Sequence, residues 1–218
     1  YSRAWDEMIR QWRAPRTNDA VWLTYSANYL FNTRGLKWAV DPVLLRNRVP
    51  EAPGDDRGRD LHELDFILLS HAHADHVDVA LWSQLAGARS HWIVPEYMIE
   101  CFSRSVPRGV PYSSAIPGRA LEIAGVRITP FEAPHDERAA GGDTRHVPST
   151  GYWVETTGGN YLLPGDIRTY DPTCLKPFLP VSAVFAHVFL GRSAALAAHP
   201  PLAEAFVDFY RFCRPKKI

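Results

Sequence analysis

Three histidines and an aspartate fall within six positions of the stretch LSHAHADHVD, residues 69–78. They are His71, His73, Asp75 and His76, and they follow the apolar run FILL. Imidazole and carboxylate are the ligands that zinc and similar divalent cations prefer in proteins. A packed core has little use for so many polar side chains in succession. The pattern H-x-H-x-D-H therefore predicts a metal site.

The spacing of these residues indicates how many ions the site takes. In an extended segment, residues two apart point the same way. His71 and His73 can therefore bind one ion, while Asp75 and His76, one step further round the turn, reach a second. Two cations about 3.5–4 Å apart form the usual hydrolytic pair. We therefore expect a binuclear centre.

The flanking sequence predicts the elements that hold this run in place. DFILLS is typical of a strand buried on both faces, and VDVALWSQLAG of a helix that Asp78 caps and Gly87 ends. Upstream, SRAWDEMIRQW predicts an amphipathic helix, and VWLTY, NYLFN and KWAVD predict a meander of strands with Gly35 in a hairpin turn. Downstream, HWIVP and EYMIECF predict a further strand and a short helix.

The second half of the chain repeats this theme. ALEIAGVRITPF and GYWVETTGGNYLLPGD predict hairpins, PVSAVFAHVFL a buried strand, PPLAEAFVDFYRFC a helix, and PKKI the start of one more strand. We therefore expect an α/β fold, a four-layer αββα sandwich that forms one domain over residues 1–218. It would lack its last strand, because the sequence stops there, and we favour truncation at the C-terminus.

Composition narrows the class of protein. Lys plus Arg and Asp plus Glu each number 24, and this balance disfavours a nucleic-acid partner. No apolar run approaches the roughly 18 residues that a transmembrane helix needs. The three cysteines are widely spaced, which predicts reduced, mostly buried thiols and a cytoplasmic protein.

The histidine run resembles that of the metallo-β-lactamase-fold hydrolases. Ser70 before the first histidine, and Asp78 two positions beyond the last, make it most similar to one branch. That branch includes N-acyl phosphatidylethanolamine phospholipase D and the ascorbate-6-phosphate lactonase-like proteins. The resemblance implies two divalent metal ions, usually zinc, with manganese or iron as alternatives.

The resemblance also implies further site residues. His135, after the strand in VRITPFEAPHDE, matches the third histidine ligand, and Asp166, ending NYLLPGD, matches the aspartate that bridges both ions. His146, in a polar loop, is the rival for the third histidine, and we prefer it as a contact to substrate or to a ligand. Asp41, ending the strand KWAVD, would bond the second nitrogen of a ligand imidazole.

The family's last ligand is a histidine after one further strand, and here the sequence departs from the pattern. No histidine follows RPKKI, and His187 and His199 are the only late alternatives. His187 lies in a strand-like run and is interpreted as a core or rim residue. His199 is a weaker candidate for a place near the site.

The predicted function is hydrolysis by a metal-bridged hydroxide. Asp166 would bridge the ions, and Asp75 would take a proton or hold the hydroxide. The substrate would be an ester, lactone, amide or phosphodiester of a small molecule or lipid. No G-x-S-x-G pattern indicates a covalent acyl enzyme.

Three rival functions stay open at this point. A nuclease of the same fold would cut RNA or DNA. A mononuclear iron oxygenase would act on a persulfide and leave Asp75 and His76 idle. A non-catalytic binding module would keep only the scaffold. The substrate, the metal and the oligomeric state are open as well.

Overall fold

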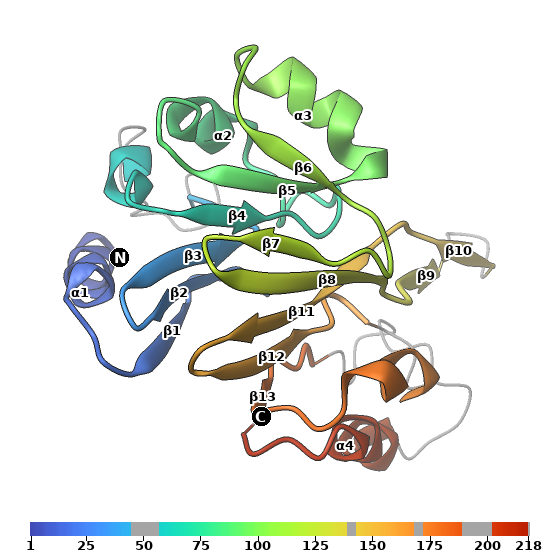
Figure 1. Cartoon of the computed structure of the whole chain (residues 1–218). Helices are drawn as coiled ribbons and strands as arrows, with labels where there is room; N and C mark the ends of the chain where they lie inside the picture. The colour runs from blue at the N-terminus through green and yellow to red at the C-terminus, as the bar shows by residue number, and fades with distance from the viewer. Residues whose placement is uncertain (45–56, 139–142, 168–171, 189–201, 218) are drawn as a thin grey trace. The chain divides into compact units, whose positions relative to one another are not determined.

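The computed structural model describes residues 1–44, 57–138, 143–167, 172–188 and 202–217. The chain divides into two compact units, Tyr1–Ala115 and Ile116–Ile218. Each unit is built on one main sheet with helices packed against it (Figure 1). The α/β class is therefore confirmed, and the assignment of the whole chain to a single domain stays a prediction.

The first unit contains a six-stranded sheet in the order β1-β2-β3-β4-β5-β6. The strands are β1 Asp19–Leu23, β2 Tyr29–Thr33, β3 Leu36–Val40, β4 Phe66–Leu68, β5 His91–Pro95 and β6 Tyr112–Ala115. The first three pair antiparallel, with Gly35 at φ +97° in the predicted hairpin turn. From β3 onward the strands pair parallel, so β3 and β4 end at the same edge of the sheet.

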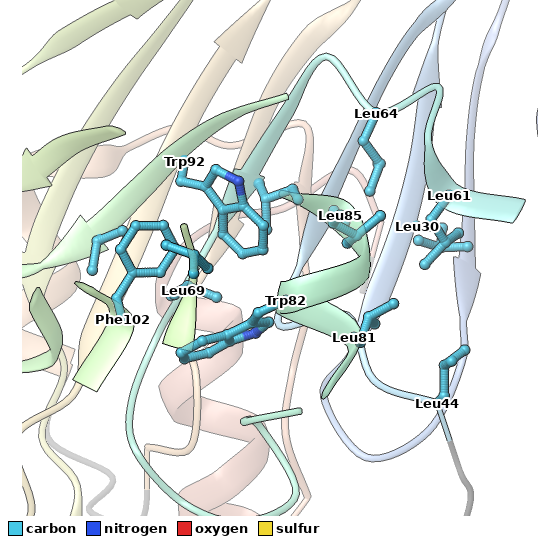
Figure 2. Packing of buried hydrophobic residues seen from close by; sticks show 14 of the residues in the cluster. Leu30, Leu44, Leu61, Leu64, Leu69, Leu81, Trp82, Leu85, Trp92 and Phe102 are labelled. Atoms are coloured by element: carbon cyan, nitrogen blue, oxygen red, sulfur yellow. The ribbon is translucent and has the colours of Figure 1, made fainter. Parts of the chain in front are cut away.

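Helices cover one face of this sheet. They are α1 Ser2–Arg13, α2 Val79–Leu85 and α3 Ile99–Ser105, with the short 3₁₀ helices η1 Arg57–Leu61 and η2 Glu96–Met98. Trp82 of α2 packs with its ring centroid 6.1 Å from Trp92 of β5, which in turn lies 5.2 Å from Phe102 of α3 (Figure 2). Because burial of such rings stabilises by several kcal/mol each, α2 is held firmly at the end of the histidine run.

The second unit contains a five-stranded sheet in the order β13-β12-β11-β8-β7. Its elements are β7 Leu121–Ile123, β8 Val126–Glu132, β9 Asp136–Arg138, β10 Thr144–His146, β11 Thr150–Thr156, β12 Gly159–Leu163, η3 Pro172–Phe178, β13 Ala183–Val184 and α4 Leu202–Phe212. Both predicted hairpins are confirmed, β7–β8 and β11–β12. Phe209 and Tyr210 of α4 are buried in one cluster with Leu162 and Val184 of the sheet.

Two predictions in this unit were wrong in part. Of the strand expected over PVSAVFAHVFL, the described residues form only Ala183–Val184, and the backbone N–H of His187 donates to the hydroxyl of Tyr210 at 3.3 Å and not to a neighbouring strand. Phe189 and Leu190 lie outside the described residues. The loop expected around His146 contains the antiparallel pair β9–β10. At PKKI, Lys217 forms a parallel bridge with Ala183, which fits the predicted start of a strand.

Within the described residues, no helix is both long and apolar enough to cross a membrane.

The prediction that the cysteines are mostly buried holds for Cys213 and is wrong for Cys101, which is exposed on α3. Burial raises the pKa of the Cys213 thiol to about 11, and neighbouring Cys174 adds to the shift. Cys213 therefore stays a neutral, unreactive thiol until the pH approaches that value. We expect iodoacetamide at pH 8 to label Cys101 quickly and Cys213 only after unfolding, as read by peptide mass spectrometry. Equal labelling of both thiols in the folded protein would contradict the burial.

Gly151 of β11 provides a test of the packing in the second unit. A Cβ at this position would lie 2.3 Å from Cζ of Phe131, a buried ring that packs against Phe178 at 4.7 Å between centroids. We expect Gly151→Ala to lower the free energy of unfolding by about 1–3 kcal/mol, because the ring must move within a filled core. Gly87→Ala is the matched control, since its Cβ meets nothing within 4 Å. Denaturant unfolding that gives equal stability for both variants would contradict this packing.

Candidate metal centre

The histidine run forms the loop between β4 and α2 in the first unit, and both ends of this loop are fixed. The backbone N–H of Leu69 donates to the carbonyl of Ile93 at 3.0 Å, which extends the sheet to the first residue of the run. At the other end, the carboxylate of Asp78 accepts from the N–H of Leu81 and from that of Leu44, both at 2.9 Å. The loop is therefore bonded to the sheet, to the helix that follows it and to Leu44 in the segment after β3.

The four candidate ligands of this loop lie together in two pairs. His71 and His76 are fully buried, while His73 and Asp75 are partly exposed. His71 Nε2 lies 3.0 Å from His73 Nδ1, and His76 Nε2 lies 3.9 Å from Asp75 Oδ2. The two buried rings have centroids 4.0 Å apart. These are the two pairs that the spacing predicts, although their role as metal ligands stays a prediction.

A buried carboxylate beneath the loop orients the two buried imidazoles. Oδ1 of Asp41, directly after β3, accepts from the backbone N–H of Ser70 at 2.7 Å. Oδ2 lies 2.8 Å from His76 Nδ1 and also accepts from the Ser70 hydroxyl. The oxygen of that hydroxyl lies 2.9 Å from His71 Nδ1. The Asp41 carboxylate accepts from His76 Nδ1, and the Ser70 hydroxyl, which already donates its proton to Asp41, accepts from His71 Nδ1. Both rings therefore carry a proton on Nδ1 and present Nε2.

The backbone of Asp41 is itself held in an unusual conformation. Its φ is +43°, in the left-handed region that costs a non-glycine residue free energy unless its surroundings hold it there. The Asn28 amide donates to the carbonyls of Asp41 at 2.8 Å and of Asp75 at 2.9 Å. Burial raises the pKa of the Asp41 carboxyl, and the hydrogen bonds from His76 and Ser70 act in the opposite direction.

Two residues of this network had no signal in the sequence. Asn28 read as part of a strand, and Tyr97 as part of a short helix. The Tyr97 hydroxyl donates to the carbonyl of Ser70 at 2.5 Å. Each contact joins residues that are far apart in the chain, so no local sequence pattern predicts it.

The second unit contributes a second set of candidate ligands. His135 follows β8 and Asp166 follows β12, and both are buried. Each offers a ligand atom, and these two atoms lie within 4.8 Å of one another. The carbonyl of His135 accepts from the N–H of Val147 at 2.8 Å, which fixes the backbone beside the ring. His135 Nε2 also lies 3.8 Å from Glu137 Oε1.

The rival histidine, His146, has a different environment. It lies on β10, its side chain is 53% exposed, and its Nδ1 is 3.1 Å from Asp136 Oδ1. His146 is exposed and bonded to a carboxylate of its own, and these two features favour His135 as the third imidazole. His199, the weaker candidate, lies outside the described residues.

His187, interpreted from the sequence as a core or rim residue, is partly buried and lies against a candidate ligand. Its Nδ1 is 2.5 Å from Asp166 Oδ1, and its side chain is 16% exposed. The sequence signal that could have identified His187 as a site residue is its position after an apolar strand, where other candidate ligands also occur.

The donor sets fit divalent cations by their chemistry. Each unit buries imidazole nitrogens beside carboxylate oxygens, which is the ligand combination that zinc, manganese and iron accept. Asp41 also lies within ligand distance of His71 and His76. Both of its oxygens already accept hydrogen bonds from the network, so its place is behind the imidazoles and not on the ion.

The chain belongs to the Beta-lactamase superfamily domain family, because a sequence profile of that family matches residues 35–207. No curated protein matches the chain. Among solved structures, it is similar to CmlA, a diiron β-hydroxylase from Streptomyces venezuelae, with a TM-score of 0.57 and 18% identity over 78% of this chain and 34% of that one.

Two further structures show the same fold. A candidate metal-dependent hydrolase from Parabacteroides distasonis gives a TM-score of 0.57 and 15% identity, covering 75% of this chain and 67% of that one. The metallo-β-lactamase fold protein YhfI from Bacillus subtilis gives 0.52 and 18%, covering 72% and 61%. The chain thus spans between 34% and 67% of the length of these three proteins. The predicted metallo-β-lactamase fold is confirmed.

Asp41 is the residue whose loss should damage the first ligand set most. We expect Asp41→Ala to lower the free energy of unfolding by about 3–5 kcal/mol, because the buried donors of Ser70 and His76 lose their acceptor. Asp41→Asn should cost less, since asparagine tolerates a positive φ and keeps one carbonyl oxygen. Denaturant unfolding of both variants measures the difference, and an Asp41→Asn loss equal to that of Asp41→Ala would contradict the role of these hydrogen bonds.

Proposed function

We propose that the chain is a metal-dependent hydrolase that works with two divalent cations, most simply zinc. The observation that carries this proposal is the Asp41–Ser70 network, which holds the Nδ1 atoms of His71 and His76 and leaves Nε2 as the presented nitrogen. Any buried imidazole needs hydrogen-bond partners, but here the two oriented rings lie 4.0 Å apart. A metal ligand needs such an orientation, because it decides which nitrogen can bind the ion.

The proposed ligands are His71, His73, Asp75 and His76 from the first unit, and His135 and Asp166 from the second. By the family pattern, Asp166 would hold the cations with its carboxylate and His135 would supply the third imidazole. Within each unit, the assignment is supported by burial and by the short distances between ligand atoms.

When bound, two divalent cations lower the pKa of water towards neutrality and polarise the scissile carbonyl or phosphoryl group of a substrate. The chain's own residues then have simple tasks. Asp41 and Ser70 orient the buried imidazoles through their Nδ1 atoms. Asp75, which is partly exposed and 3.9 Å from His76 Nε2, is placed to hold or accept a proton at its carboxylate.

The substrate class that the resemblance favours is a small molecule or lipid with an ester, lactone, amide or phosphodiester bond. The branch of N-acyl phosphatidylethanolamine phospholipase D and the ascorbate-6-phosphate lactonase-like proteins is the reason for this choice. The equal numbers of acidic and basic residues, 24 each, disfavour a nucleic-acid substrate.

A second candidate function is oxidation at a pair of iron ions. It is favoured by one finding, the shared fold with CmlA, which is a diiron β-hydroxylase. Imidazole and carboxylate ligands suit iron as well as zinc. The two candidates differ in the metal retained and in the need for dioxygen.

Metal analysis and hydrolysis assays test the proposal together. We expect about two divalent ions per chain, and hydrolysis of at least one of a lactone, a phosphodiester and a thioester that chelation abolishes and added zinc restores. His71→Ala should lower the metal content and the rate by at least about tenfold. His91→Ala is the matched control, because that histidine bonds Ser113 at 2.9 Å and is not in the proposed ligand set.

Other outcomes would contradict the hydrolase. Two irons per chain with substrate-dependent uptake of dioxygen would favour the hydroxylase, and a single iron would favour a persulfide oxygenase. A chain that retains no divalent cation would leave only a binding role for the scaffold.

A further inference from the structure

The contact between His187 and Asp166 extends the proposed centre beyond the ligands that the family pattern supplies. Nδ1 of His187 lies 2.5 Å from Oδ1 of Asp166, and the Asp166 side chain is only 3% exposed. An ionised carboxylate is acceptor-only. The imidazole must therefore place a proton on Nδ1 and donate it to this oxygen.

The fold brings these two residues together by strand pairing. β13 runs parallel to β12, with Leu162 opposite Val184, and the Phe185 N–H donates to the Leu162 carbonyl at 2.9 Å. Parallel neighbours end at the same edge of a sheet, where α/β folds bind ligands. Asp166 and His187 each follow the carboxyl end of one of these strands.

The position of His187 is also fixed from its backbone. Its N–H donates to the hydroxyl of Tyr210 on α4 at 3.3 Å, and Tyr210 is 1% exposed in the core of this unit. The ring thus starts from a backbone that is held by a buried tyrosine of α4.

We propose that His187 is a positioning residue of the metal centre, which donates from Nδ1 to Oδ1 of Asp166 and so orients that carboxylate towards the cations. This inference rests on the proposed function. Carboxylates that bind metals are themselves hydrogen-bonded, and loss of such a partner typically weakens metal binding about 10–100-fold. His187 acts through Asp166 and is not assigned as a ligand.

The experiment compares three substitutions of His187 by zinc titration with a competing chelator. Asparagine places its amide nitrogen where Nδ1 lies, glutamine places it nearer to Nε2, and alanine removes the donor. We expect His187→Ala and His187→Gln to raise the Kd for zinc about 10–100-fold, and His187→Asn to keep it within about threefold. The ligand-field spectrum of the cobalt-substituted protein should change for the first two and not for His187→Asn.

Two controls separate positioning from folding. His91→Ala should leave the Kd unchanged, and the chelated forms of all variants should melt at similar temperatures. If His187→Ala does not fold, the comparison of asparagine with glutamine still decides the matter, because both are polar and of similar size.

The inference is overturned if His187→Ala binds zinc like the parent chain, or if His187→Asn loses as much affinity as His187→Ala. The latter result would mean that His187 binds the ion directly through Nε2. A parent chain that binds no divalent cation overturns the proposed function and this inference with it. A parent that binds two ions, with unaffected variants, overturns the inference alone.

Discussion

The first ligand set depends on one buried anion, the carboxylate of Asp41. A carboxylate out of water is costly unless donors surround it, and here the donors are the Ser70 backbone, the Ser70 hydroxyl and His76. The same bonds that solvate the charge set the proton positions on the imidazoles. Stability and site geometry are therefore coupled. Without the carboxylate, His76 would lose the acceptor that places its proton on Nδ1, and Ser70 would lose the acceptor that orients its hydroxyl towards His71.

The ends of parallel strands explain why side chains from separate segments can be held so closely. β3 and β4 are paired neighbours, so Asp41 and the histidine run begin at one edge of the first sheet. β12 and β13 place Asp166 and His187 at one edge of the second. Aromatic cores pack against both sheets, so the strand ends that lead to the candidate ligands are rigid. The histidine run is a loop, but it is fixed at both ends by the bonds of Leu69 and Asp78.

The sequence predicted the local pattern and missed most of the contacts between distant residues. The run from His71 to His76 is local, whereas Asp41, His135 and Asp166 came from the family resemblance, and each of them follows a predicted strand. Asn28 and Asp75 are 47 positions apart, and His187 and Asp166 are 21 apart, so their contacts follow from tertiary pairing that periodicity does not encode. The β9–β10 pair was missed because its residues, DER and TRH, are all polar and show no apolar alternation, yet the two strands pair antiparallel.

The hydrogen bonds in the two ligand sets share a direction. In each set, an imidazole Nδ1 donates its proton to a carboxylate. In the first set the carboxylate of Asp41 orients histidines, and in the second set, by our proposal, His187 orients the carboxylate of Asp166. Such pairs present Nε2 lone pairs and an anionic oxygen, and these are the groups that attract a cation. An Asp–His proton-transfer dyad presents its Nε2 lone pair in the same way, but it needs only one imidazole. The first unit instead gathers three imidazoles, with His71 Nε2 3.0 Å from His73 Nδ1 and the rings of His71 and His76 4.0 Å apart. This number of donors favours a centre built to hold metal over one in which a single histidine is the base.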